Sequence, residues 1–149
     1  MKRIVTGGCE AFTFAGRRPR LFELCALALA PLVPKIAGML PGPHWHGPIP
    51  MLLAVAVYPF LEECVFRAGM QRGIERALLR SALDSRCCAA AAAMVSSVLF
   101  ACAHSFGRDL GAGLRVSIPA LALGWLYARH RSLSLNSAIH AWWNAVFVI

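Results

Sequence analysis

The most constraining feature of the chain is a run of 20 residues without any Asp, Glu, Lys or Arg. This run, CCAAAAAMVSSVLFACAHSF, occupies residues 87–106. A transmembrane α-helix needs about 20 consecutive apolar residues to cross the hydrocarbon core of a bilayer. Four further apolar segments lie at residues 21–40, from about 49 into the sequence EECVFR, at 110–128 and at 133–149. The sequence therefore predicts an all-α fold, a polytopic membrane bundle of about five transmembrane helices.

The composition supports an integral membrane protein rather than a soluble domain. Hydrophobic residues make up 58% of the 149 residues and charged residues 15%, against about 45–50% and about 25% in ordinary soluble domains. Segment 21–40 contains Glu23 and Lys35, and no A-x-A-like cleavage site follows it, so we expect an uncleaved first helix. We expect a basic cytoplasmic segment at 1–20, followed by a single transmembrane domain at 21–149.

The positive charges predict how the chain is oriented in the membrane. The net charge is +8, and 12 of the 15 Lys and Arg residues precede the first apolar segment or lie in the links after the second and fourth. Cytoplasmic loops carry an excess of Lys and Arg, so we expect a cytoplasmic N-terminus. This orientation accounts for the basic charge without a nucleic-acid partner. Because Arg is favoured over Lys and Ala and Gly are abundant, we expect a bacterial, multi-pass protein of the inner (plasma) membrane.

Two adjacent acids, Glu62 and Glu63, follow the second apolar run in the stretch FLEECVFRAG at residues 60–69. Ionisable groups at membrane depth are costly and usually functional. The four-residue recurrence of Arg72, Arg76 and Arg80 indicates that the helix continues beyond these acids. The acids are therefore expected inside the membrane rather than at its surface.

Counting residues from the predicted turns brings further polar side chains to the depth of Glu62. Glu62 lies 21 residues before Leu83 and His104 lies 21 residues after it, so the two can face each other across a helical hairpin. His140 lies nine residues beyond the next turn at Arg131, or about 13 Å into the bilayer. His140 and Asn144 are four residues apart and share one helical face. The sequence predicts a polar site at mid-depth.

Three motifs on these helices resemble those of the CAAX-protease and bacteriocin-processing (CPBP) family of intramembrane proteases. They are Glu62-Glu63-x-x-x-Arg67, Phe100-x-x-x-His104 and His140-x-x-x-Asn144. The sequence GWLYARHRSLSLNSAIHAWWN at 124–144 is also similar to that family's approach to its last motif. The resemblance covers residues 59–144.

The resemblance implies an endopeptidase that hydrolyses a peptide bond within a membrane cavity by glutamate-activated water. It implies that Glu62 is the general base and that His104 helps it to hold and activate the water. His140 and Asn144 would donate hydrogen bonds to the oxyanion. Glu63 and Arg67, at positions i and i+4, would form a structural ion pair that neutralises both charges inside the bilayer.

The resemblance also suggests a substrate and an assembly. Short bacterial members resemble maturation enzymes for proteins with C-terminal sorting tags, so we expect a membrane-anchored protein or peptide rather than a prenylated one. The expected partners are this substrate and the lipid bilayer. The chain is short for the family, and a homo-oligomer could close its cavity.

Three other functions stay open on the sequence alone. Glu62, His104 and His140 are residue types that bind zinc with an open fourth position, although no H-E-x-x-H sequence is present. We expect a mechanism without metal or other cofactor and keep a zinc-dependent protease as the alternative. The others are a catalytically silent scaffold or immunity protein that binds peptide, and a small transporter in which these groups relay protons.

Overall fold

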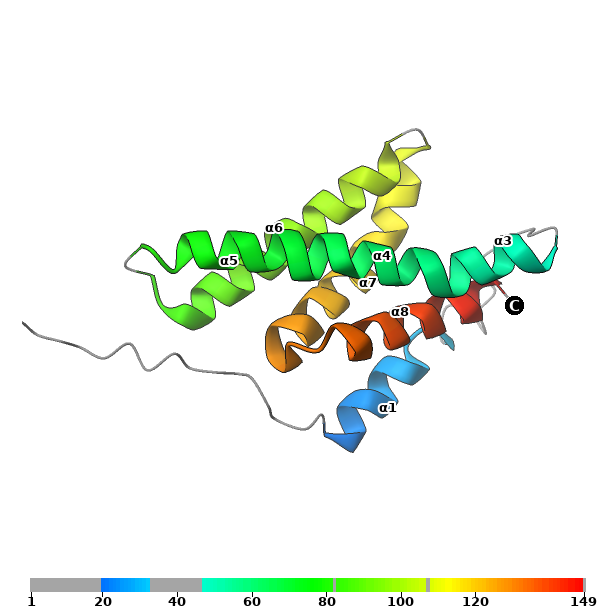
Figure 1. Cartoon of the computed structure of the whole chain (residues 1–149), viewed down its shortest axis with the longest axis horizontal. Helices are drawn as coiled ribbons and strands as arrows, with labels where there is room; N and C mark the ends of the chain where they lie inside the picture. The colour runs from blue at the N-terminus through cyan, green and yellow to red at the C-terminus, as the bar shows by residue number, and fades with distance from the viewer. Residues whose placement is uncertain (1–19, 33–46, 82, 107, 149) are drawn as a thin grey trace, which may run out of the picture.

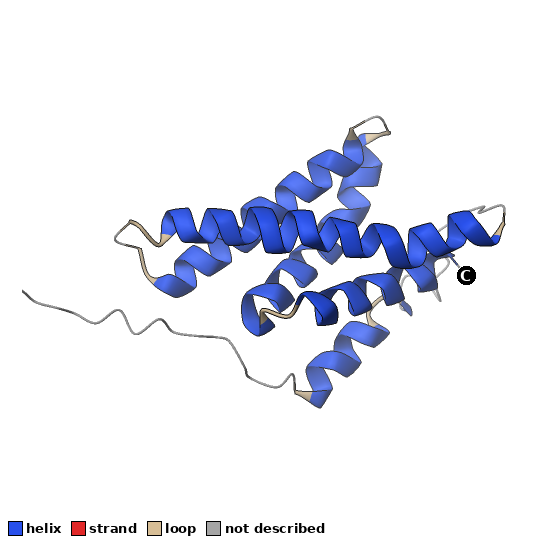
Figure 2. Cartoon of the chain, in the orientation of Figure 1, coloured by secondary structure: helices blue, strands red, loops and turns tan. Residues whose placement is uncertain are grey.

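The computed structural model describes residues 20–32, 47–81, 83–106 and 108–148, and within these ranges every regular element is a helix (Figure 2). The expected basic segment lies outside the described residues except for Arg20, and so do residues 33–40 of the first apolar segment. The described part confirms the predicted all-α fold. The described part contains five separate helices, if the continuous elements α3 to α5 (Pro48–Leu78) are taken as one, and their positions in the sequence agree with the five predicted segments.

The longest of these helices is a rod of consecutive helical turns, Pro48–Leu78. It confirms that the helix continues through Glu62 and Glu63, and its 31 residues would extend about 46 Å. The rod is longer than the hydrocarbon core is thick, so one end can project from the membrane. Its parts are α3 (Pro48–Leu52), η1 (Leu53–Val57), α4 (Tyr58–Glu63), η2 (Cys64–Gln71) and α5 (Arg72–Leu78).

The two η segments are π-helical, a feature that the sequence analysis did not predict. A π-helix closes hydrogen bonds from residue i to residue i+5 and so has more residues in each turn than an α-helix. The η1 segment ends two residues before Pro59, which is buried and has no backbone N–H to donate. The wider turn therefore occurs where the α-helical hydrogen-bond ladder is interrupted.

The next two helices, α6 (Ser85–Ser105) and α7 (Leu110–His130), form a tightly packed hairpin. Each begins at an aspartate whose side chain caps the helix: Asp84 accepts a hydrogen bond from the Arg86 N–H, and Asp109 accepts one from the Ala112 N–H. Small residues let the two backbones approach closely. Those buried in this pair include Ala89, Ala92, Ala93, Ala112, Gly113, Ala120 and Gly124.

The last helix, α8 (Leu133–Val148), lies beside the rod, and α1 (Leu21–Leu29) lies against α8 (Figure 1). The indole N–H groups of Trp142 and Trp143 donate to the carbonyl oxygens of Ala28 and Leu27, at 2.8 and 2.7 Å. At the other end of α1, Glu23 pairs with Arg129 at 2.7 Å. Hydrogen bonds at both ends therefore fix α1 to the rest of the bundle.

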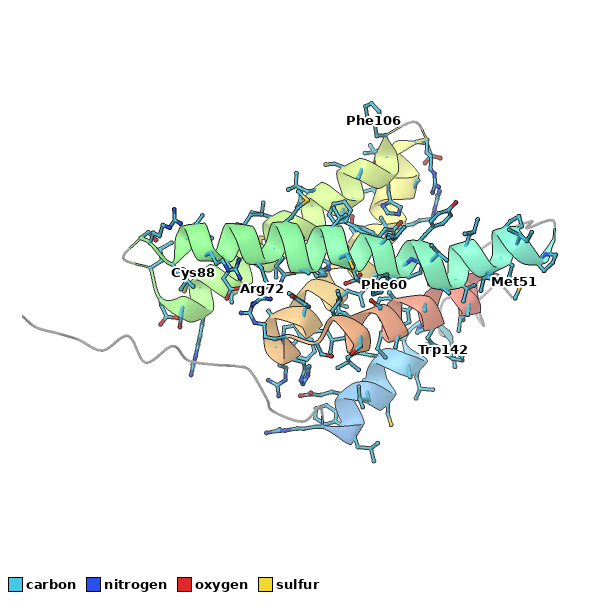
Figure 3. The ribbon with its side chains drawn as sticks, in the orientation of Figure 1. Met51, Phe60, Arg72, Cys88, Phe106 and Trp142 are labelled. Atoms are coloured by element: carbon cyan, nitrogen blue, oxygen red, sulfur yellow. The ribbon has the colours of Figure 1, made fainter. Side chains whose placement is uncertain are left out.

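The surface of the bundle is suited to lipid. By length and composition, three helices of the described part could cross a membrane: the Pro48–Leu78 rod, α6 and α7. Large apolar side chains are exposed on these helices, including Ile118 at 78% and Leu114 at 64%. Figure 3 shows others that point outward, such as Phe106 at the α6–α7 turn. The chain is therefore a helical membrane protein, and a set of its polar side chains is buried between the helices.

The close packing of α6 on α7 predicts that Gly113→Ala destabilises the bundle. A Cβ at Gly113 would lie 2.0 Å from Ser105 Oγ and 2.6 Å from the Ala101 carbonyl oxygen. Such overpacking costs about 1–3 kcal/mol. Thermal unfolding of the purified protein in detergent would measure the loss.

Gly73→Ala is the matched control, because nothing lies within 4 Å of a Cβ at Gly73. Its midpoint should stay unchanged or rise, since alanine favours a helix over glycine. Equal midpoints for the two variants would contradict the close contact at Gly113.

Candidate active site

One face of the rod carries four buried polar residues, each four positions after the last: Glu63, Arg67, Gln71 and Glu75. An α-helix has about 3.6 residues per turn, so a residue four positions later is rotated slightly past one full turn around the axis. A π-helix has more residues per turn, so in η2 the same step of four residues gives a smaller rotation. The mixture of α and π turns keeps these side chains on the face that meets the other helices. We call this set the polar stripe.

The Glu63 carboxylate is fully buried and has three partners. Arg67, one turn later on the rod, places its Nε 3.4 Å from Glu63 Oε2. Two partners come from α8: Asn136 Nδ2 donates to Oε2 at 2.5 Å, and His140 Nδ1 lies 2.9 Å from Oε1. Burying a charge is costly unless it is paired and hydrogen-bonded. Glu63 meets both conditions and so attaches α8 to the rod.

Arg67 connects the rod to the α6–α7 hairpin. Its guanidinium donates to the hydroxyl oxygens of Ser96 and Ser97, both at 3.4 Å, and to the Ala120 carbonyl oxygen at 2.9 Å. The Ser96 hydroxyl in turn donates to the Phe66 carbonyl oxygen at 2.7 Å. These hydrogen bonds replace the hydrogen bonds to water that the guanidinium loses when it is buried in the bundle.

The remaining two residues of the stripe complete the connections. Gln71 Nε2 donates to the Gly124 carbonyl oxygen on α7 at 2.9 Å. Glu75 accepts two hydrogen bonds from Arg131, which lies between α7 and α8. These hydrogen bonds raise the pKa of the Arg131 guanidinium above its ordinary value. The pair therefore stays ionised at the end of the bundle.

Glu62 faces away from the stripe, toward a cavity. Its side chain is 29% exposed, whereas that of Glu63 is 0% exposed. Two imidazole nitrogens approach the Glu62 carboxylate: His104 Nε2 at 3.8 Å and His140 Nε2 at 3.6 Å. Direct hydrogen bonds are shorter, at about 2.7–3.2 Å. Contacts of this length suit groups that share a bridging water.

Hydrogen bonds at the other ring nitrogens fix which way the two histidines point. His104 Nδ1 lies 3.0 Å from the Phe100 carbonyl oxygen. A carbonyl oxygen only accepts, so Nδ1 carries the proton and Nε2 of the neutral ring is an acceptor aimed at Glu62. The Glu63 carboxylate holds His140 Nδ1 in the same way. Both rings therefore present Nε2 to the cavity.

The Phe100 ring supports this arrangement. It stacks on the His104 ring with centroids 4.2 Å apart and meets the His140 ring at an angle, with centroids 6.0 Å apart. Phe100 itself is buried against Phe66 of the rod. The two imidazoles are thus held by packing as well as by hydrogen bonds.

The cavity measures about 330 Å³, and its lining comes from the rod, α6, α7 and α8. Asn144 lies in this lining, and its Nδ2 donates to the Ala54 carbonyl oxygen at 2.9 Å. A pocket of this size accommodates a small segment of a ligand. The polar residues in the lining are Tyr58, Glu62, His104, Arg108, Arg115, His140, Trp143 and Asn144.

The structure therefore brings Glu62, His104, His140 and Asn144 together on one cavity, with the Glu63–Arg67 pair directly behind it. The sequence analysis missed Asn136 and Gln71. Both had a detectable pattern: Asn136 lies one helical turn before His140, and Gln71 lies one turn after Arg67. Ser96 and Ser97 were also missed, because nothing in an apolar run distinguishes a serine that contacts arginine.

Metal binding was the main alternative chemistry at this site. Within residues 20–32, 47–81, 83–106 and 108–148, no group of three or more His, Cys, Asp or Glu side chains is arranged to hold a metal ion.

Two adjacent acids with different surroundings predict different effects on stability. Glu63→Gln leaves the Arg67 charge buried without its counter-ion, which costs about 3–5 kcal/mol. Glu62→Gln leaves the stripe intact and faces the cavity, so it should cost about 1 kcal/mol or less. Unfolding of both variants in mixed detergent micelles would compare them directly. A similar loss for both would show that Glu63 has no special structural role.

Comparison with known proteins identifies the family. The family model described as "Type II CAAX prenyl endopeptidase Rce1-like" matches residues 44–146, more than half of the chain. No curated protein and no solved structure matches the chain. The matched range contains all three motifs and the helices that line the cavity except for the last two residues of α8, which confirms the resemblance found in the sequence. The chain therefore belongs to the Rce1-like type II CAAX endopeptidase family, a family of membrane proteases.

Proposed function

We propose that this membrane endopeptidase uses Glu62 to activate the water that hydrolyses the substrate's peptide bond. The observation that carries the proposal is the approach of His104 Nε2 and His140 Nε2 to the Glu62 carboxylate inside the cavity. A general base must lie within hydrogen-bond reach of the proton that it removes, directly or through one water. Glu62 is the acid that lines the cavity within the described residues.

The tautomers indicate how the water would be activated. The Glu62 carboxylate and the neutral His104 Nε2 both accept hydrogen bonds, so one water between them would donate one hydrogen bond to each. Its oxygen lone pairs would then be free to attack the carbonyl carbon of the scissile bond. Glu62 would take the proton and later give it to the departing amine.

The oxyanion that forms in this step needs hydrogen-bond donors. His140 could donate through Nε2 when its ring is protonated, and the Glu63 carboxylate at Nδ1 would stabilise that cation. Asn144 lines the same cavity, and its side-chain amide has a second N–H besides the one that binds Ala54. In this scheme Glu63 orients His140, and Asn136 orients Glu63.

The distribution of arginine supports an orientation and a location for the proposed enzyme. Arg129 and Arg131 lie at the end of the bundle where Glu23 and Glu75 pair with them, and the backbone N–H of Arg20 donates to Glu23 at the same end. We assign this end to the cytoplasm by the positive-inside rule and place the protein in a bacterial inner membrane. The proposed substrate is a protein or peptide with a membrane-anchored end, cleaved near that end without a metal or other cofactor.

Glu62→Gln should abolish cleavage, because removing a general base lowers the rate by about 10²–10⁴-fold. Wild type and the variant would be purified in detergent and incubated with membrane fractions from the native organism, with and without a chelator. Mass spectrometry should find new chain ends with wild type alone, and the chelator should not prevent them. Arg80→Gln, at an exposed position just beyond the rod, is the control and should cleave like wild type.

Two outcomes would contradict this mechanism. Cleavage that is lost with chelator and restored specifically by zinc would indicate a metalloprotease. If wild type and Glu62→Gln are both folded and yield the same fragments, the chain does not act as a glutamate protease. A peptide-binding scaffold would then be the better interpretation.

A further inference from the structure

The cavity that contains Glu62 lies toward one end of the bundle. Its lining comes from the part of the rod before Glu63, the last turns of α6, the first half of α7 and the second half of α8. In the other direction the buried polar stripe and its partners fill the space between the helices. We therefore expect a substrate to reach Glu62 from the end that carries the α6–α7 turn.

Two arginines lie at that end, and both contribute to the cavity lining. Arg108 is exposed in the turn, four residues beyond His104 in the sequence, and lines the cavity together with Glu62. Arg115 lies near the start of α7 and its side chain is 59% exposed. Its ion pair with Asp109 is 3.9 Å long and also exposed, so it contributes little and is readily exchanged.

The position of these arginines is unusual for the chain as a whole. Eleven of the 15 basic residues lie in the segments assigned to the cytoplasmic side, and Arg67 is buried in the polar stripe. Arg108 and Arg115 lie at the opposite end, where a positive charge is not needed to orient the helices. They also contribute to the lining of the cavity that contains the proposed general base. These two features indicate that Arg108 and Arg115 contact the substrate.

We propose that Arg108 and Arg115 bind a carboxylate of the substrate at the mouth of the cavity and so determine specificity. Guanidinium groups present planar pairs of N–H donors that match a carboxylate. They would also offset the repulsion between an acidic substrate and Glu62. The carboxylate would belong either to the substrate's C-terminus or to an Asp or Glu side chain. This inference rests on the proposed function, since it names the substrate class of the same site.

The size of the cavity limits where this carboxylate lies in the substrate. A volume of about 330 Å³ holds only a short piece of peptide. Arg108 lines the same cavity as Glu62 and His104, so the carboxylate would lie close to the water-binding groups. The cleaved bond would therefore be within a few residues of the carboxylate.

A binding experiment on the inactive Glu62→Gln protein in lipid nanodiscs tests the proposal. The probes are four mixtures of N-palmitoylated hexapeptides, randomised at the remaining positions. The first pair compares a free C-terminus with an amidated C-terminus. The second pair has an amidated C-terminus throughout and compares a fixed Asp with a fixed Asn. Retention on the immobilised protein is measured by mass spectrometry. We expect at least one carboxylate mixture to be retained about tenfold more than its neutral counterpart, a difference of about 1.4 kcal/mol.

Variants at the mouth of the cavity show whether the arginines cause this preference. Arg108→Gln and Arg115→Gln should abolish it, and the Arg80→Gln control should keep it. Changing both arginines to Glu should reverse it, so that mixtures with a fixed Lys are retained instead. Retention of the mixture with a free C-terminus would identify the substrate's C-terminal carboxylate, and retention of the mixture with a fixed Asp would identify a side-chain carboxylate.

Three results would overturn the proposal. The first is equal retention of carboxylate and neutral mixtures, including no retention of either. The second is a preference that survives both Gln substitutions. The third is loss of bound anionic phospholipid in the Arg variants without any change in peptide retention, which would assign the arginines to lipid headgroups. Because the Glu62→Gln protein cannot cleave, these results are independent of whether the wild type is a protease.

Discussion

The ion pair between Glu63 and Arg67 is the interaction on which the rest of the structure depends. Both side chains are 0% exposed inside a bundle whose surface is apolar. A buried pair repays its desolvation only when further hydrogen bonds satisfy the remaining polar atoms. Those bonds come from Asn136 and His140 on α8 and from the α6–α7 hairpin. Satisfying one ion pair therefore fixes how four helices are placed.

The same pair explains how two neighbouring acids can serve different purposes. Consecutive residues on a helix point about 100° apart, so Glu63 faces the helices and Glu62 faces the cavity. His140 contacts both, with Nδ1 on Glu63 and Nε2 near Glu62. The buried network thus holds the His140 ring, which lines the cavity, in place.

The positions of the main helices and of the site could be predicted from the sequence, because both depend on regular geometry. Apolar length predicted the rod, α6 and α7, and equal residue counts from a turn predicted that Glu62 and His104 meet. The π-helical turns could not be predicted, because α-helical and π-helical turns of the same sequence have the same hydropathy. The docking of α1 through Trp142 and Trp143 was also missed, because it joins indoles to backbone carbonyls far away in the sequence.

The buried stripe has a consequence for the membrane as well as for the enzyme. Glu63, Arg67 and Gln71 have no exposed surface, and together with Asn136 and Ser96 they fill the interior beside the cavity. In the proposed mechanism, water that reacts at Glu62 would therefore meet tightly packed polar side chains rather than an open path to the opposite face. A protease built in this way would admit water to its cavity without conducting protons across the bilayer.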